Sequence, residues 1–316
     1  MKTQPTIIPL ILASALAVVL PLSANAQDYR IRSQIDTTVG LERGGTVDLS
    51  LVSGKIRVTG WDRSEVKISA SIESGELRFD ANSSRVSLSV EDTDDSGNRR
   101  HHNVGEASYT VSVPRGSRLI LEAVSGDITS SGSQGEIEAN SVSGDVDVSN
   151  GVGEASVEAV SGSVHAAQIN GNLRAESVSG EVRVENVTGN IEATSVSGDV
   201  RLIGARSRDV RTETVSGDIT YSGSIDSGGR YSFESHSGTL RLNIPRGAGA
   251  QFSVETFSGD VSADFPVTLT PTGAKRREGR MEFIVGDGKA KITAQTFSGR
   301  IVIDSGSDST TRRDDE

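Results

Sequence analysis

ESVSGEVRVENVTGNIEATSVSGDV, residues 176–200, is the stretch of sequence that decides the fold. In it the pairs Ser179-Gly180 and Ser197-Gly198 lie one 18-residue period apart, and Gly189 divides that period into two equal halves. Along the whole chain a Ser-Gly pair that follows Val, Phe or His occurs ten times, and its glycine keeps the same period through positions 126, 144, 162, 180 and 198. Beyond that point the glycines stand at 217, 238, 259 and 299, so the spacing widens. A period this strict indicates a repeat architecture, in which each unit must stack on its neighbours to bury its apolar face.

Each half of the period carries apolar or small residues two and four positions after its glycine, with polar residues between them. In the example these are Val182 and Val184, then Ile191 and Ala193. Such alternation predicts a short strand with one buried face. Two strands and two turns make one coil, and stacked coils repeat every ~4.8 Å. The sequence therefore predicts an all-β fold: a parallel β-solenoid of the single-stranded β-helix type, with 18-residue coils and longer coils toward both ends.

The Ser-Gly pairs are expected to form a ladder of turns along the solenoid. Glycine would supply a positive φ, and serine would cap a backbone N–H or pair along the ladder. The regular pairs are Ser125-Gly126, Ser143-Gly144, Ser161-Gly162, Ser179-Gly180 and Ser197-Gly198. A third core contact is expected seven positions after a glycine, at Val142, Val160, Val178, Val187 and Val196. Because the pair occurs ten times, a turn explains it and a catalytic serine does not.

Composition excludes several classes of protein. Only 34 % of the residues are hydrophobic and 4 % aromatic, while 35 are glycine, which argues against an aromatic-rich core or a large helical bundle. The chain has no cysteine, so disulfides, thiol catalysis and cysteine-ligated metals are excluded. The net charge of −11 makes nucleic acid an unsuitable partner.

The segment 1–26 has the pattern of a secretory signal peptide. Lys2 precedes an apolar stretch, residues 7–20, and the segment ends in the small residues Ser23-Ala24-Asn25-Ala26. We expect cleavage after Ala26 and no transmembrane span in the mature chain, because no later apolar run reaches the ~20 residues that a span needs. The expected organisation is a signal peptide (1–26), a β-solenoid domain (27–304) and a disordered polar tail (305–316). The protein would be exported, to the periplasm, the cell surface or the medium.

Two insertions interrupt the repeat and carry its densest basic clusters. Residues 91–106 contain Arg99 and Arg100, and residues 266–289 contain Lys275, Arg276 and Arg277. Both are expected to be loops. They are candidate binding loops for an anionic glycan or a lipid headgroup, although basic runs in loops more often serve solubility. The segment 28–45 and the charged tail are expected to cover the unpaired strand edges at the two ends.

Acidic residues recur directly after the turn glycines. They are Asp127, Asp145, Glu181, Asp199, Asp218 and Asp260. A regular exterior column is typical of a solvated face, whereas a glycosidase needs one isolated carboxylate pair in a cleft. Calcium binding is a lesser alternative, because the G-G-x-G-x-D signature of calcium-binding rolls is absent. The four histidines, His101, His102, His165 and His236, are scattered, so no catalytic, metal or cofactor site is expected.

The chain resembles a bacterial family of β-strand-repeat domains of unknown function to which an adhesin role has been attached. The resemblance rests on the Val-Ser-Gly-Asp-Val units, on strands that run into Pro114-Arg115-Gly116 and Pro245-Arg246-Gly247, on residues 53–62, and on the closing residues 296–301. It extends over roughly residues 46–304. It implies a cell-envelope location and assigns no catalytic residues.

Three functions remain open on the sequence. The first is a non-catalytic, exported envelope or surface β-solenoid that acts as an adhesin-like binding or spacer module, with an envelope glycan, a lipid headgroup or a protein as partner. The second is an envelope polysaccharide-active enzyme on a β-helix scaffold, which requires a pocket lined by two close carboxylates and an aromatic side chain. The third is an accessory protein of envelope stress or assembly.

Overall fold

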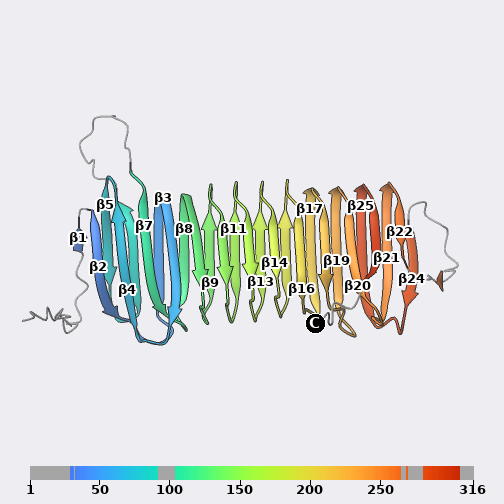
Figure 1. Cartoon of the computed structure of the whole chain (residues 1–316), viewed down its shortest axis with the longest axis horizontal. Coiled ribbons are helices and arrows are strands. Elements are labelled where there is room, and N and C mark those ends of the chain that lie inside the picture. The colour runs from blue at the N-terminus through green and yellow to red at the C-terminus, as the bar shows by residue number, and fades with distance from the viewer. Residues whose placement is uncertain (1–28, 32, 92–103, 265–267, 270–279, 307–316) are drawn as a thin grey trace, which may run out of the picture.

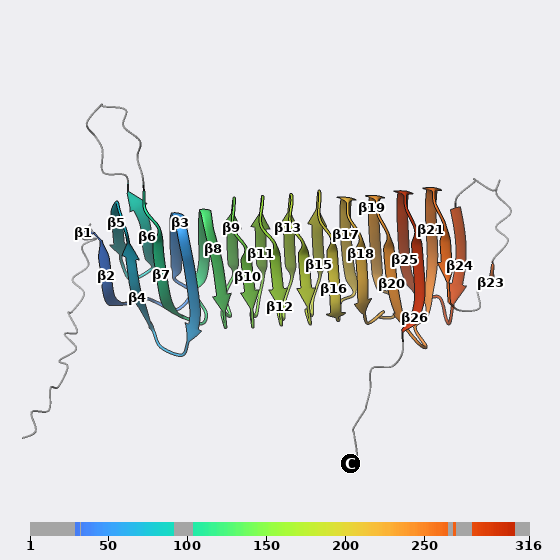
Figure 2. The same cartoon turned by 45° about the horizontal axis from the view of Figure 1, so that its top comes forward.

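In the computed structural model, the described residues are 29–31, 33–91, 104–264, 268–269 and 280–306. All regular elements among them are β-strands, which lie side by side across the long axis of an elongated body (Figures 1 and 2). No helix in this part of the chain is long and apolar enough to cross a membrane. The all-β prediction is confirmed.

The strands line two sides of the solenoid, because each coil gives one strand to each side, and the long strands β3 (Thr46–Trp61) and β8 (Arg118–Ser131) run through both. From its N-terminal end, the first side runs β1 (Tyr29–Ile31), β5 (Glu76–Ala81), β6 (Arg85–Glu91), the first half of β3, the first half of β8, β9 (Ile137–Ser141), β11 (Ala155–Ala159), β13 (Leu173–Ser177), β15 (Ile191–Ser195), β17 (Asp209–Ser216), β19 (Arg230–Ser237), β25 (Ala290–Ser298), β21 (Ala250–Ser258), β24 (Arg280–Val285) and β23 (Thr268–Leu269). The second side runs β2 (Gln34–Gly40), β4 (Glu65–Ile72), β7 (Ala107–Pro114), the second halves of β3 and β8, β10 (Val146–Ser149), β12 (Val164–Ala167), β14 (Val182–Glu185), β16 (Val200–Ala205), β18 (Ile219–Gly223), β20 (Leu240–Pro245), β26 (Ile301–Gly306) and β22 (Val261–Ala263).

In the regular part, equal positions of successive coils pair in parallel. Val146 lies opposite Val164, Val164 opposite Val182, and Val182 opposite Val200, so each coil spans one period of the sequence. Strands β9, β11, β13 and β15 pair in the same way on the first side. The predicted parallel solenoid with 18-residue coils is confirmed.

The interior is narrow where the coils are shortest and widens where they lengthen. Val164 and Val182 are fully enclosed, at 0 % exposure. Toward the C-terminal end the coil between β17 and β19 is longer, since Val210 lies opposite Tyr231, and the larger side chains of Tyr221 and Phe233 pack there with ring centroids 5.1 Å apart. Burial raises the pKa of Tyr221, so its hydroxyl stays protonated and donates to the Ser224 carbonyl at 2.6 Å.

Antiparallel strands cover the N-terminal end of both sides. The outer strand β1 pairs with β5, and the outer strand β2 pairs with β4, which itself pairs antiparallel with β7. The part of segment 28–45 that the structure describes therefore takes the edge positions expected for it.

The C-terminal end departs from the sequence order. Strand β25 lies between β19 and β21, and β24 folds back antiparallel on the outer side of β21. The expectation that residues 266–289 form only a loop is wrong, because Arg280–Val285 is a strand whose Phe283 is buried and stacks on Phe252 at 4.8 Å. Strands β24 and β23 thus cover this end of the first side, while most of the tail proposed for that role, residues 307–316, lies outside the described residues.

The two faces of each strand, inward and outward, predict opposite effects of substitution. Val164→Asp should lower the free energy of unfolding by at least about 4 kcal/mol, because it buries a charge without a partner between two stacked coils. Asp145→Asn should change it by less than about 1 kcal/mol, since the side chain is exposed and keeps an oxygen that can accept the Ser163 N–H at 2.8 Å. Urea unfolding followed by circular dichroism measures both; similar values for the two variants would contradict the assigned inside and outside.

Candidate functional site

The glycines of the Ser-Gly turns stack on one another with no room for a side chain. A Cβ added to Gly162 would lie 2.0 Å from the carbonyl oxygen of Gly144, and one added to Gly180 would lie 2.0 Å from that of Gly162. None of the five regular turn glycines has a positive φ. The expected reason for glycine here is therefore wrong: the close approach of the neighbouring coil excludes a side chain, and no left-handed conformation is involved.

Left-handed backbone occurs instead at the opposite turn of the coil. Gly153, Gly171 and Gly189 have φ values of 115°, 159° and 123°. Close to them, Asn150 and Asn186 adopt φ values of 55° and 53°, which asparagine tolerates better than most residues. In the regular coils the positive φ thus belongs to the second turn, whereas among the Ser-Gly glycines outside them Gly54, Gly238 and Gly259 do have a positive φ.

The hydroxyl that caps the Ser-Gly turn comes from a different serine than expected. Ser125, Ser143, Ser161, Ser179 and Ser197 are all exposed. Where the buried residue two positions earlier is a serine, its hydroxyl donates to the carbonyl of the turn glycine of the preceding coil: Ser141 to Gly126 at 2.9 Å and Ser177 to Gly162 at 2.9 Å. The signal in the sequence was the longer motif Ser-Val-Ser-Gly, whose first serine continues the buried positions of the strand.

The acidic column has a structural role. The Asp145 carboxylate accepts the backbone N–H of Ser163 at 2.8 Å, and Asp199 accepts that of Asp218 at 2.9 Å, in each case from the next coil. Arg201 bridges Glu181 and Asp199, and its hydrogen bond to Glu181 raises the pKa of the guanidinium. Asp145 and Asp199 therefore satisfy the backbone of the neighbouring coil.

The remaining candidate residues lie mostly in parts of the chain that the structure does not describe. Arg99, Arg100, Lys275, Arg276 and Arg277 lie outside the described residues, as do His101 and His102. His165 contacts Asp147 through Nδ1 at 3.0 Å. Among the described residues, no group of three or more His, Cys, Asp or Glu side chains could hold a metal ion.

A column of exposed valines runs along the solenoid beside the Ser-Gly turns. Its members are Val52, Val124, Val142, Val160, Val178, Val196 and Val215, each 41–50 % exposed. The expectation of a third core contact at Val142, Val160, Val178 and Val196 is therefore wrong, whereas Val187, at the opposite turn, is buried. The cause is the buried serine or alanine directly before each of these four valines, which takes the inward position and turns the valine outward. We call the set of seven the valine column.

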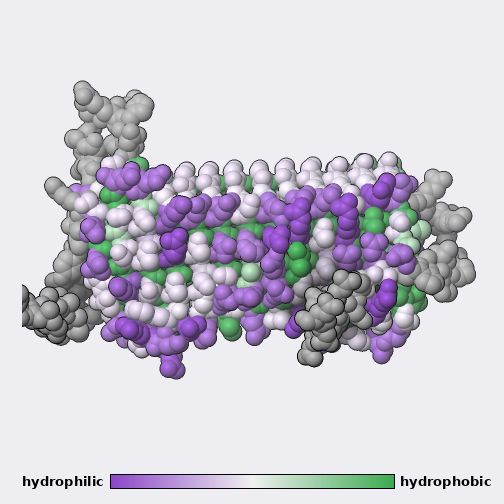
Figure 3. All heavy atoms as spheres, viewed as in Figure 1, coloured by the Kyte–Doolittle hydropathy of each residue, from purple (hydrophilic) through white to green (hydrophobic). Residues whose placement is uncertain are grey.

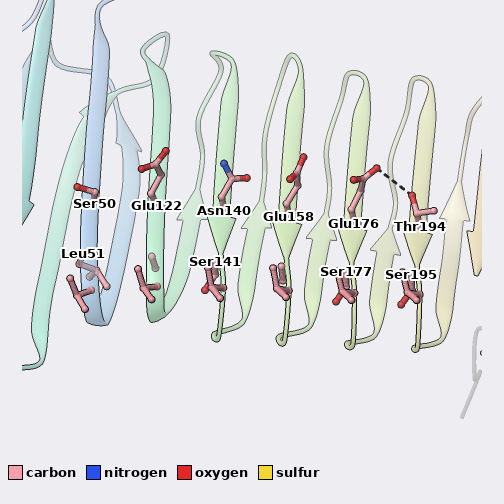
Figure 4. A pocket seen from close by; sticks show the side chains of 18 of the residues that line it. Ser50, Leu51, Glu122, Asn140, Ser141, Glu158, Glu176, Ser177, Thr194 and Ser195 are labelled. Carbon is pink, nitrogen blue, oxygen red and sulfur yellow. Dashed lines mark hydrogen bonds between the residues drawn. The ribbon is translucent and has the colours of Figure 1, made fainter.

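Six members of the valine column, all except Val215, form one side of a groove of about 680 Å³ across six coils. The other side is a row of outward-facing, mostly polar residues that we call the acidic wall, and Figure 4 shows six of its members in line on successive coils: Ser50, Glu122, Asn140, Glu158, Glu176 and Thr194. Between the two lie inward-turned residues such as Ser141 and Ser177. Over one face of the molecule, green apolar patches lie between rows of purple polar side chains along the long axis (Figure 3). The groove thus has an apolar side of exposed valines and a mostly polar side, and an exposed apolar stripe of this extent is typical of an interaction site.

At its C-terminal end the groove becomes aromatic. His236, Phe297 and Phe257 continue the valine column, with ring centroids 4.9 and 4.8 Å apart and planes within 5° of parallel. They line a second hollow of about 400 Å³ together with continuing members of the acidic wall, among them Glu213 and Glu234. Three carboxylates, those of Glu213, Glu234 and Glu255, thus line one hollow with aromatic side chains, and this includes the combination that the enzyme alternative requires.

Comparisons with known proteins bear on the family. The family model Toastrack DUF4097 matches residues 87–304. This chain belongs to the Toastrack DUF4097 family. The membership confirms the resemblance inferred from the repeat. Among solved structures, a Clostridium sporogenes protein provisionally named a cell adhesion protein is 13 % identical, with 86 % of this chain and 99 % of that chain covered and a TM-score of 0.24, values that carry no argument. No curated protein matches.

The stacked turns of this Toastrack chain predict a steric effect. Gly162→Ala should lower the free energy of unfolding by at least about 2 kcal/mol, because the new methyl group meets the backbone of the preceding coil. Gly116→Ala is the matched control: nothing lies within 4 Å of the added Cβ, so its effect should stay within about 0.5 kcal/mol. Thermal melts of both variants give the comparison, and a Gly162→Ala protein as stable as the control would contradict it.

Proposed function

We propose that the chain is a non-catalytic, exported binding module of the bacterial cell envelope or surface and that the groove is its recognition surface. The observation that carries the proposal is the valine column, which exposes an unbroken apolar stripe over seven coils and ends in three stacked rings. Contiguous exposed apolar surface of this extent is typical of interaction sites. Many equal contacts along one line suit an elongated partner, because weak contacts add along its length.

The geometry of the aromatic end favours binding over hydrolysis. Glu213 lies opposite Glu234 in the register of β17 and β19, and Glu255 lies in the same row beyond Gln295, so the three carboxylates project from the same wall. Glycosidases instead hold their two carboxylates on either side of the scissile bond. Arg211 pairs with Glu213 at 3.7 Å, and Ser232 donates to Glu234 at 3.0 Å, so both carboxylates have neighbours that keep them in the wall.

Export forms the second part of the proposal. The signal peptide (residues 1–26) lies outside the described residues, and its sequence pattern supports the proposal. The proposed mature domain, residues 27–304, contains the whole family match. We place it in the periplasm or on the cell surface.

Export predicts a defined mature N-terminus. The protein recovered from outside the cytoplasm should begin at Gln27, because Ser23–Ala26 end in the small residues that signal peptidase accepts. Intact-mass measurement of the chain expressed with its own N-terminus gives the answer. A full-length chain confined to the cytoplasm would refute this part.

The recognition surface predicts a loss of binding without a loss of folding. The double variant Val160→Asp/Val178→Asp should bind isolated envelopes of the producing bacterium about tenfold more weakly, because it places charges on the apolar side of the groove. The matched control is Ile203→Asp, which replaces an exposed aliphatic residue of β16 on the other side of the solenoid. Sedimentation of protein with envelopes measures the affinity, and circular dichroism checks the fold. Equal binding by the wild type, the double variant and the control would refute the role of the groove in recognition. Turnover of envelope polysaccharide by the purified protein would refute the non-catalytic role.

A further inference from the structure

We infer that the occupant of the groove is an extended polypeptide segment that carries aliphatic and cationic side chains. The inference rests on the proposed role of the groove as the recognition surface and adds the chemistry of the partner. Three features of the described residues support it: the charge of the acidic wall, the cross-section of the groove and its aromatic end.

The acidic wall offers carboxylates without partners. Neither Glu122 nor Glu158 has a hydrogen bond or an ion pair from its side chain within the described part of the chain, and both line the groove opposite a valine. Glu176, the next wall residue, is paired with Arg174 at 2.6 Å. Unpaired carboxylates beside an apolar stripe attract Lys or Arg side chains whose aliphatic stems lie on the valines while their charged ends reach the wall. The same wall repels phosphate-bearing glycans and anionic lipids.

The cross-section of the groove fits an extended chain. Its volume of about 680 Å³ extends over five coil spacings, so the open section measures on the order of 30 Å². Such a section admits a single row of side chains but not a whole α-helix, which is about 10–12 Å across. An extended backbone presents such a row in a straight line along its whole length, as a straight groove across stacked coils requires.

The side-chain repeat of an extended peptide differs from the coil repeat of the solenoid, and this difference limits the sequence specificity of the groove. Side chains on one face of an extended peptide recur every ~6.8 Å, whereas the coils recur every ~4.8 Å. The two repeats therefore do not stay in register, and no side chain of the partner has a fixed pocket. The groove would therefore select a segment for its content of apolar and basic residues more than for their order.

The aromatic end supplies an anchor. Phe257 is 79 % exposed; Phe297 stacks on one of its faces, and no other ring in the described part of the chain stacks on it. An exposed aromatic ring next to Glu255 suits a guanidinium, which stacks on the ring while it pairs with the carboxylate. An arginine near one terminus of the segment would therefore fix the direction in which the segment lies.

The test is fluorescence anisotropy of the full chain with labelled synthetic peptides of about 12 residues. A peptide that alternates Val and Lys should bind about tenfold more tightly than one that alternates Val and Glu, and most of the difference should vanish on going from about 0.1 M to about 0.5 M salt. Shuffling the order of the Val-Lys peptide should change its Kd by less than about threefold. One terminal Arg should tighten binding to the wild type but not to Phe257→Ala.

Matched variants locate the effect. Glu158→Gln, in the acidic wall, should weaken the Val-Lys peptide about fivefold, whereas Glu154→Gln, an exposed glutamate outside the groove, should leave the Kd unchanged. Val160→Thr/Val178→Thr, which keeps the size and the β-preference of the side chains, should weaken it about tenfold.

The outcomes separate this inference from the proposed function. If the valine variants weaken binding of an uncharged oligosaccharide or a fatty acid and the Val-Lys peptide does not bind, the groove is a recognition surface and the assigned partner is wrong. If the peptide binds equally to the wild type and to all groove variants, its site lies elsewhere, and the inference fails whatever the envelope experiment shows. Tighter binding of the Val-Glu peptide would overturn the role of the acidic wall.

Discussion

The close approach of successive coils at the Ser-Gly turn is the constraint on which the rest of the structure depends. Parallel backbone hydrogen bonds, such as Val164 N–H to the Glu181 carbonyl at 2.9 Å, hold neighbouring coils together along both sides of the solenoid. At the turn the coils come so near that only glycine fits, and the strict period of the glycines follows from that requirement. Every other position is then repeated above and below itself. Each side chain in this fold is therefore one member of a column of equivalent side chains that runs along the solenoid.

The sequence was sufficient to predict the columns of the core. Period and alternation together placed Val146, Val164 and Val182 in one buried line, and the registers agree. The hydrophobicity of the valine column suggests burial, but the alternation of inward and outward residues along each strand predicts exposure, and the alternation is correct. Alternation continued along β13 from Leu173 leads to a buried Ser177 and an exposed Val178. The buried serine is stable because its hydroxyl finds the carbonyl of Gly162, a contact between coils that no single strand reveals.

The order of the last coils could not be read from the repeat. The units that contain β21 and β25 both fit the pattern, and the repeat alone would stack them in chain order. The antiparallel pairing of β24 with β21 decides otherwise, because it occupies one side of β21 and leaves the other side for β25. The alternation of side chains in Arg280–Val285 does predict a strand. Its pairing with β21 could not be predicted, because the connection between the two strands has no counterpart in the repeat.

The stability of the fold alone does not require valine in the exposed column. The half of each side chain that is buried contacts its neighbours in the adjacent coils, and threonine, of the same shape and with a similar preference for strands, would make most of those contacts while exposing a hydroxyl to water. The acidic wall next to it does vary: serine, glutamate, asparagine and threonine all occur there, and the fold accommodates each of them. A column that stays apolar through seven coils and then changes to stacked aromatic rings, beside a wall whose residues vary, fits the proposed role of the groove as a recognition surface.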